Sequence, residues 1–300
     1  MTDSRVARPA TGSPRMSRAN VITPGSGHEA ARGPLVDPNW LADHLDDPGV
    51  RVIEVDVSAS AYDDWHIDGA VLWNVYTDLK DGDYRTVEGD AFERLVAGSG
   101  IAPDTTVVFY GYAPALGVWL LALYGHRDAR ILDCSRDAWR AAGRPWSTTP
   151  AQPVATDVHL DPTERGIRAR LVDVTAAIGR PGVTLVDVRS GAEYRGERFW
   201  PSGGLEPGGQ AGHVPSAVHQ PIDGLYDERG AFGDVAALRG VFSAVDPDGA
   251  DELITYCTIG GRACTAWFVL TYLLGRDGVR VYDGSWAEWG RMPEAPVEQA

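Results

Sequence analysis

An internal duplication is the feature of this chain that most constrains its fold. Blocks of similar sequence recur in the same order in the two halves of the 300 residues. The matched blocks are residues 52–57 and 183–188, 66–71 and 213–218, 106–110 and 253–257, 116–124 and 264–274, and 130–139 and 280–289. An ordered series of such matches predicts two domains with the same fold.

Each half alternates short aliphatic strands with helix-like stretches. Runs such as 185–188 and 253–256 are apolar throughout or nearly so, which is typical of strands in a sheet that is buried on both faces. The long apolar helical stretch of each half is followed by a glycine, Gly125 or Gly275, a common stop signal. We therefore predict an α/β protein with two domains, each a mainly parallel sheet flanked by helices.

The ends of these domains follow from composition. Residues 1–33 are rich in Ser, Gly, Pro and Arg and show little aliphatic periodicity, so we predict a disordered tail, and it has no apolar stretch like that of a secretory signal. Residues 146–167 contain several prolines among Ser, Thr and Asp, which predicts an extended linker. The two domains would then span 34–145 and 168–300.

Charge and cysteine content narrow the classes of function. The chain has 42 acidic and 27 basic residues and a net charge of -15, which argues against a nucleic-acid partner because such proteins need a basic surface. No apolar run reaches the roughly 18 to 20 residues of a membrane span. Three cysteines cannot form a disulfide framework and favour a reducing, cytoplasmic location.

The loop at 256–263 carries the main chemical signal. Cys257 follows a buried strand and precedes a long helix, the place where parallel α/β sheets bind ligands. Backbone N–H groups and the helix dipole favour a thiolate there. The residues expected to surround the sulfur are Thr258, Ile259, Gly260, Gly261, Arg262 and Ala263.

In this loop the two glycines let successive amides converge on one anion, and Arg262 adds a fixed positive charge. The pattern predicts a nucleophilic thiolate that takes a group from a small anionic donor and holds it covalently. The alternative is that Cys257 is a buried cysteine that acts only as a small hydrophobe.

Several motifs together resemble those of the tandem-domain rhodaneses, the family of thiosulfate and 3-mercaptopyruvate sulfurtransferases. The similarity runs from about residue 35 to the C-terminus and is carried by residues 257–262, 185–190, 212–218 and 281–289. It implies two rhodanese-like domains and a sulfane sulfur carried as a persulfide on Cys257. The sulfur would pass to a thiophilic acceptor such as cyanide or a thiol, including a protein thiol. The resemblance implies no metal and no organic cofactor, and the seven histidines show no metal-ligand spacing.

The first half lacks the thiol. The position that matches Cys257 is Tyr110 or, with a slip of one residue, Gly111, and the shorter loop that follows has Pro114 in place of the glycine pair. A persulfide cannot form there. We therefore expect the first half to be a structural partner of a catalytic second half.

Candidate substrate-binding residues outside the loop are Arg189, Arg195, Asp187 and Trp286. The two arginines could line the mouth of the cleft, or they could form a solvated surface cluster with Glu193 and Glu197. Some relatives have an arginine near the position of Glu193, so an anionic donor would lack one partner here. Asp187 is expected to cap or orient the loop, and Trp286 to wall the pocket or pack against the sheet.

The other two cysteines suggest packing roles. Cys264 lies two turns into the helix among aromatic residues, where a core position is favoured over a resolving thiol. Cys134 stands where the second half has Gly284, and loop or core packing is expected for it.

Several functions remain open from the sequence. Arg262 at the end of the loop favours thiosulfate as the donor, while Thr258 departs from the residue that many thiosulfate enzymes have there. The alternative donor is 3-mercaptopyruvate, whose enzymes usually have a Cys-Gly-Ser/Thr-Gly loop. A Cys-dependent phosphatase of the same fold would need one more residue between Cys257 and Arg262. A non-enzymatic sulfur carrier or interaction module is the third possibility.

Overall fold

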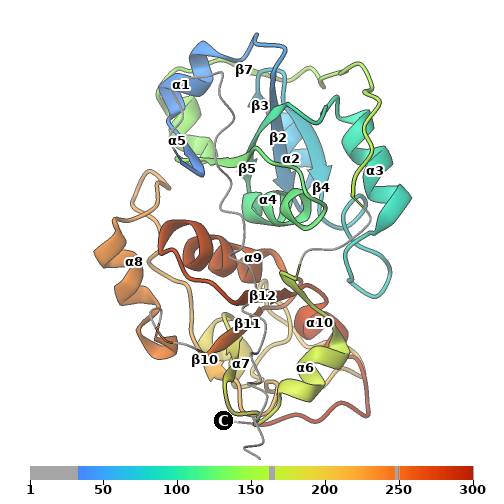
Figure 1. Ribbon diagram of the computed structural model, residues 1–300, viewed down its shortest axis with the longest axis vertical. Coiled ribbons are helices and arrows are strands. Elements are labelled where there is room, and N and C mark those ends of the chain that lie inside the picture. Colours follow the sequence, from blue (N-terminus) through green and yellow to red (C-terminus); the bar gives the residue numbers. More distant parts are fainter. Residues whose placement is uncertain (1–32, 162–165, 247–248, 250, 300) are drawn as a thin grey trace, which may run out of the picture.

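The computed structural model describes residues 33–161, 166–246, 249 and 251–299. The predicted disordered tail lies outside these residues except for Gly33, as do residues 162–165 of the predicted linker. The two halves of the chain are stacked along the long axis of the molecule (Figure 1). Two helices lie where the halves meet: α4 (Pro114–Leu123) of the first half and α9 (Gly261–Phe268) of the second, which pack against each other.

The first half contains a five-stranded parallel sheet in the order β1-β6-β5-β2-β4. Its strands are β1 (Leu35–Val36), β2 (Val50–Asp56), β4 (Val71–Asn74), β5 (Thr106–Gly111) and β6 (Ala129–Leu132). The antiparallel pair is β3 (His66–Ile67) and β7 (Trp146–Ser147), so the stretch predicted as a linker begins by pairing with the first half. The helices besides α4 are α1 (Pro38–Asp43), α2 (Ala59–Asp64), α3 (Gly89–Gly98) and α5 (Arg136–Ala141).

The second half repeats this sheet in the order β10-β9-β11-β12-β8, again wholly parallel. Its strands are β8 (Arg168–Ala169), β9 (Val183–Asp187), β10 (Val218–His219), β11 (Glu252–Tyr256) and β12 (Val279–Tyr282). The helices besides α9 are α6 (Leu171–Ala177), α7 (Gly191–Tyr194), α8 (Val235–Val241), the 3-10 turn η1 (Ser243–Val245), the π-helical turn η2 (Val269–Leu273) and α10 (Ser285–Trp289). The predicted pair of α/β domains with mainly parallel sheets is confirmed.

Matching hydrogen bonds show how the two copies align. The Tyr110 hydroxyl accepts a hydrogen bond from the Ile67 N–H at 2.9 Å, and the Tyr256 hydroxyl accepts one from the Val214 N–H at 3.1 Å. Both tyrosines are buried at the end of the central strand of their sheet. Tyr110 is therefore the counterpart of Tyr256, which shifts the alignment of these strands by one residue from that of the sequence blocks.

Gly111 is thus the counterpart of Cys257, one of the two candidates that the sequence left open. Its φ is +103°, and a Cβ at this position would lie 2.9 Å from the Val55 carbonyl oxygen. A side chain there would need both an unfavourable backbone conformation and a shift of β2. The first half therefore lacks the space for a cysteine as well as the cysteine itself.

The core continues from one half into the other. Residues 115–123 of α4 are all buried, and α9 is buried apart from Arg262. A helix that is apolar on every side is stable only when it is covered on every side, and here each of the two helices packs on its own sheet and on the other helix. Among the described helices, none has the length and hydropathy needed to cross a membrane.

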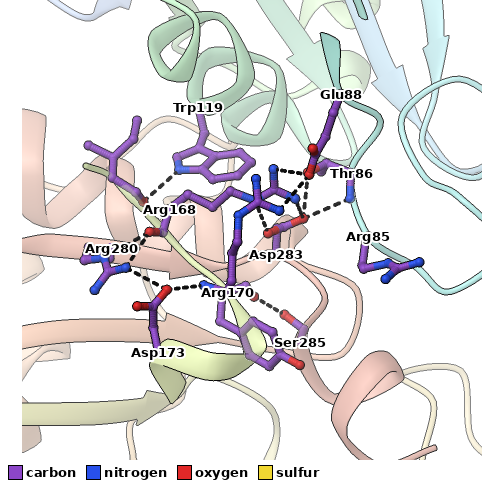
Figure 2. A network of polar contacts seen from close by, with 12 residues as sticks. Arg85, Thr86, Glu88, Trp119, Arg168, Arg170, Asp173, Arg280, Asp283 and Ser285 are labelled. Carbon is purple, nitrogen blue, oxygen red and sulfur yellow. Dashed lines mark hydrogen bonds and ion pairs between the residues drawn. The ribbon is translucent and has the colours of Figure 1, made fainter. Parts of the chain in front are cut away.

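The first half sends a loop, residues 80–86, onto the second half. The loop is closed by an antiparallel bridge between its first and last residues. The Thr86 N–H and hydroxyl donate to the Asp283 carboxylate at 2.9 and 2.6 Å. Arg168 of β8 donates to the same carboxylate at 2.9 and 3.1 Å, so a buried carboxylate just beyond β12 joins the two halves (Figure 2).

The second half returns this contact. Residues 226–232 form a loop with the same bridge, and the Phe232 N–H donates to the Asp133 carboxylate at 2.9 Å. Asp133 follows β6 as Asp283 follows β12, so the two contacts are equivalent. The halves are therefore related by an approximate two-fold arrangement in which each loop docks on the other half.

Candidate active site

Cys257 lies between β11 and α9 and is 1% exposed. Its Sγ accepts a hydrogen bond from the Gly260 N–H at 3.1 Å. Gly260 has a φ of +94°, and a Cβ there would come within 2.9 Å of the Asp283 carbonyl oxygen. Glycine is therefore required at this position for the loop to curl back so that a backbone amide points at the sulfur.

The start of α10 holds the loop in place. The Cys257 N–H donates to the Ser285 hydroxyl at 3.1 Å, and the Trp286 N–H donates to the Cys257 carbonyl at 2.9 Å. The Ala287 N–H donates to the Thr258 carbonyl at 2.8 Å. Residues 281–289, one of the sequence motifs, thus position the cysteine through the Ser285 hydroxyl and two backbone amides.

Arg262 forms a two-point ion pair with Glu193 of α7. Its Nη1 and Nη2 donate to the two carboxylate oxygens at 2.9 and 2.7 Å. The Thr258 hydroxyl donates to the same carboxylate at 2.6 Å and accepts from Arg262 Nη2 at 2.9 Å. The fixed positive charge that the sequence predicts at the end of the loop is therefore already paired with a side chain of the protein.

The Glu193 carboxylate is charged at neutral pH although it is fully buried. Burial by itself would raise its pKa, but hydrogen bonds from Arg262, the charge of Arg262, and hydrogen bonds from Thr258 and Ser190 lower the pKa to about 2. For Arg262, burial would lower the pKa, while Glu193 and the nearby Cys257 sulfur raise it. The pair is therefore ionised, and its two charges largely cancel.

A pocket of about 190 Å³ opens above Cys257. Its lining residues are Tyr112, Pro201, Ile222, Tyr226, Cys257, Thr258, Ile259, Gly261, Arg262 and Thr265. The structure thus brings together most of the predicted loop residues. Gly260 supports the sulfur from its amide, and Ala263 is buried in α9, where its carbonyl accepts from the Thr255 hydroxyl at 3.1 Å.

The arginines predicted to line the mouth lie elsewhere. Arg189 is fully buried, donates to the Asp187 carboxylate at 2.7 Å and to the Gly212 carbonyl at 2.8 Å, and lies 4.5 Å from the Trp286 ring centre. Asp187 and Trp286 are thus engaged with Arg189 in the interior of the second half.

Arg195 lies at the surface of the second half. Its side chain is 52% exposed and pairs with Glu197 at 2.7 Å. Of the two alternatives that the sequence left open for Arg195, the structure has the solvated surface pair with Glu197. None of the four candidates outside the loop is among the residues that line the pocket.

Two tyrosines at the pocket were missed from the sequence. Tyr112 follows β5 and is 54% exposed, and Tyr226 begins the loop 226–232 and is 45% exposed. Tyr112 occupies, in the first half, the position equivalent to Thr258. The alignment of the two loops, once shifted by one residue, is the signal that could have identified it.

The remaining cysteines lie outside the pocket. Cys264 is fully buried in the core, where burial raises its pKa well above the ordinary value. Cys134 is partly buried, and burial raises its pKa to about 11. Within the described ranges, no group of three or more His, Cys, Asp and Glu side chains is arranged to hold a metal ion.

Comparison with known proteins identifies relatives along most of the chain. The family model for the rhodanese-like domain matches twice, at residues 37–142 and 171–292. A protein of Mycobacterium tuberculosis named "Putative thiosulfate sulfurtransferase SseA" is 40% identical over 272 residues, which is 88% of this chain and 90% of that protein. The thiosulfate sulfurtransferase of Corynebacterium glutamicum is 38% identical over 275 residues, with the same coverage.

The fold also has a counterpart among solved structures. The crystal structure of YnjE superimposes with a TM-score of 0.77 at 24% identity and covers 89% of this chain and 68% of that chain. At this identity the likeness concerns the arrangement of the two domains.

Proposed function

This chain belongs to the rhodanese-like family, and from that premise we propose that it is a thiosulfate sulfurtransferase that carries sulfur as a persulfide on Cys257. The observation that supports this most directly is the buried Cys257 Sγ. It lies at the foot of a pocket and accepts a hydrogen bond from the Gly260 amide just before a helix begins. Such a site favours an anionic sulfur.

The proposed cycle has two displacements at sulfur. The Cys257 thiolate attacks the outer sulfur of thiosulfate, a bond forms between the two sulfurs, and sulfite leaves with the electron pair of the broken sulfur–sulfur bond. The persulfide anion then lies beside the Gly260 N–H. A nucleophilic acceptor such as cyanide or a thiol attacks the outer sulfur, and the Cys257 thiolate leaves. The cycle needs no metal and no organic cofactor, and we place it in the cytoplasm.

The choice of donor rests on Arg262. The donor 3-mercaptopyruvate has a carboxylate at a distance from its sulfur, and a free cation would be needed to bind it. Arg262 carries the cationic charge among the residues that line the pocket, and Glu193 already neutralises it at 2.7 and 2.9 Å. Thiosulfate, a compact dianion, can be held by backbone N–H groups near the sulfur. This arrangement favours thiosulfate.

Loading of sulfur onto the protein tests the proposal. The full chain is incubated with thiosulfate or with 3-mercaptopyruvate and its intact mass is measured, while thiocyanate and pyruvate are assayed in parallel. We expect thiosulfate to add one sulfur atom and to support thiocyanate formation, and 3-mercaptopyruvate to be the poorer donor.

Two variants locate the sulfur. Cys257→Ser should remove the added mass and the activity, while Cys134→Ser, which changes a cysteine outside the pocket, should retain both. The proposal fails if neither donor loads sulfur on the folded wild-type protein, or if Cys257→Ser still loads it.

A further inference from the structure

Lys80, a buried side chain from the first half, lies directly behind the Cys257 loop. It begins the loop 80–86 and is 5% exposed. Its Nζ donates to the Asp283 carbonyl at 2.8 Å, and a Cβ built on Gly260 would lie 3.2 Å from this Nζ. The Gly260 N–H donates to the Cys257 sulfur, so Gly260 lies between the Lys80 ammonium group and the sulfur.

The ion pairs next to Lys80 are made by Arg168. Asp283 is a buried carboxylate near Lys80, and its oxygens accept from Thr86 and from Arg168. Arg168 also pairs at 2.6 Å with Glu88, whose side chain is 46% exposed to solvent. Arg168 thus has two carboxylate partners, Asp283 and Glu88, whereas Lys80 Nζ contacts the backbone carbonyl of Asp283. The Cys257 sulfur is close enough for its negative charge to raise the pKa of Lys80.

Of the other described ionisable groups near Cys257, the one cation is already paired. These groups are Arg262, Glu193, Tyr112, Tyr226, Cys264 and Asp283. Arg262 and Glu193 neutralise each other. Burial raises the pKa of both tyrosines, that of Tyr226 to about 12, and burial also raises that of Cys264, so these three groups are neutral at pH 7. Lys80 is therefore the cation left for a thiolate or persulfide at Cys257.

The same position in the other loop is Tyr226. Both residues open a bridged loop that docks on the opposite half. The loop that docks on the half with Cys257 carries an ammonium group, and the loop that docks on the half with Gly111 at the equivalent position carries a neutral phenol. The charge thus occurs on the side where an anionic sulfur has to be stabilised.

We propose that Lys80 is a positioning residue of the sulfur-transfer site: from the non-catalytic half it supports Gly260 and compensates the negative charge of the Cys257 thiolate and persulfide. This inference rests on the proposed function, because it takes Cys257 as the nucleophile. Burial lowers the pKa of Lys80 below its ordinary value, and the charges of Asp283, Cys264 and Cys257 offset part of that lowering. Thiolate and ammonium therefore stabilise each other's charged form.

The test is the pH dependence of Cys257 alkylation by iodoacetamide, with the modified residue located by mass spectrometry of peptides. This reaction requires a thiolate and no sulfur donor, so its outcome is independent of whether thiosulfate is the substrate. Lys80→Met should shift the profile to higher pH by about one unit, so that the rate at pH 7 falls about tenfold while the rate at high pH is unchanged. Lys80→Arg should keep most of the wild-type profile.

Two further variants keep the test decisive. Lys80→Gln removes the charge but retains a donor for the Asp283 carbonyl, and it should shift the profile as Lys80→Met does even if the methionine variant folds poorly. Arg85→Gln removes an exposed cation from the same loop, with a side chain that is 48% exposed, and should leave the profile unchanged. The proposal is wrong if a folded Lys80→Met or Lys80→Gln protein shows the wild-type profile, or if Arg85→Gln shifts it equally.

Discussion

The two copies of the fold differ most where their central strands end. After β11 the chain has Cys257 and a left-handed glycine before a helix whose first residue is Gly261. After β5 it has Gly111, pressed against the Val55 carbonyl, and a helix that begins with Pro114, which has no N–H to donate. A sulfur site thus requires space for a side chain and backbone donors around it, and the first copy offers neither at the equivalent place.

The first copy contributes to the site from outside its own loop. Tyr112 forms part of the pocket wall and the loop 80–86 supports the Cys257 loop from behind. The pocket is therefore built by both halves although the thiol comes from one. Substitutions at five positions test this difference between the copies, from the largest expected effect to the smallest.

The two equivalent aspartates should differ in their contribution to stability. The buried Asp283 carboxylate accepts from Arg168 and Thr86, so Asp283→Asn removes the buried anion of this ion pair and should lower the free energy of unfolding by about 3 kcal/mol. Asp133 is half-buried and accepts one hydrogen bond across the interface, so Asp133→Asn should cost about 1 kcal/mol. Urea unfolding of both variants measures the difference, and equal losses would contradict the asymmetry.

Gly260→Ala should slow sulfur loading about a hundredfold, as expected for the loss of one donor to a developing or stored anion. The new Cβ would meet the Asp283 carbonyl at 2.9 Å, and the φ of +94° disfavours any other residue. The rate of mass gain with thiosulfate is the measurement. Gly82→Ala is the matched control, since nothing lies within 4 Å of its Cβ position. A normal loading rate for Gly260→Ala would show that this amide is dispensable.

Glu193→Gln should lower the free energy of unfolding at pH 7 by about 2 kcal/mol. The pKa of Glu193 is lowered from 4.5 to about 2 in the folded protein, so its carboxylate stabilises the fold above pH 4.5, and this contribution is lost as the pH falls toward 2. The stability of wild type and variant should therefore converge between these pH values, as measured by thermal unfolding. A constant gap across this range would mean that the lost stability is not due to the charge.

The same Glu193→Gln variant tests donor choice on the folded protein. Removing the carboxylate leaves Arg262 free to bind the carboxylate of a donor, so the ratio of kcat/KM for 3-mercaptopyruvate to that for thiosulfate should rise about fivefold, equivalent to about 1 kcal/mol. An unchanged ratio would show that this ion pair does not set the donor.

Tyr112→Ala should have the smallest effect. It removes an aromatic side chain that is 54% exposed from the first-half wall of the pocket, so KM for the acceptor should rise about threefold while kcat stays near the wild-type value. Tyr76→Ala, an aromatic residue with 45% exposure that does not line the pocket, is the control. Equal changes in both variants would argue against a specific contribution of the first half to acceptor binding.

Much of this structure could be predicted from the sequence because its signals are local. The duplication, the buried strands and the sequence from Cys257 to Arg262 depend on short segments and their spacing. Their predicted consequence, two parallel sheets with a cysteine loop before a helix, is what the structure has.

The partners of the site could not be predicted because they come from distant segments. Arg262 meets Glu193 and Lys80 meets Asp283 across 69 and 203 residues of sequence. Arg189 has a side chain that could bind an anionic substrate, but Asp187, two residues earlier, pairs with it in the interior. Whether a cation is paired within the protein depends on packing, and packing depends on the two-fold arrangement of the halves.

The reciprocal loops have a consequence for the history of the chain. A contact in which a loop of each half docks on the same place of the other is the isologous interface of a symmetric dimer. The chain has the architecture of such a dimer fused into one polypeptide. Fusion releases the two subunits from identical sequence, so one could give up its thiol and acquire an ammonium group suited to the other. Mixing separately expressed halves, residues 33–161 and 166–300, should therefore reconstitute a heterodimer whose two partners have become specialised for each other.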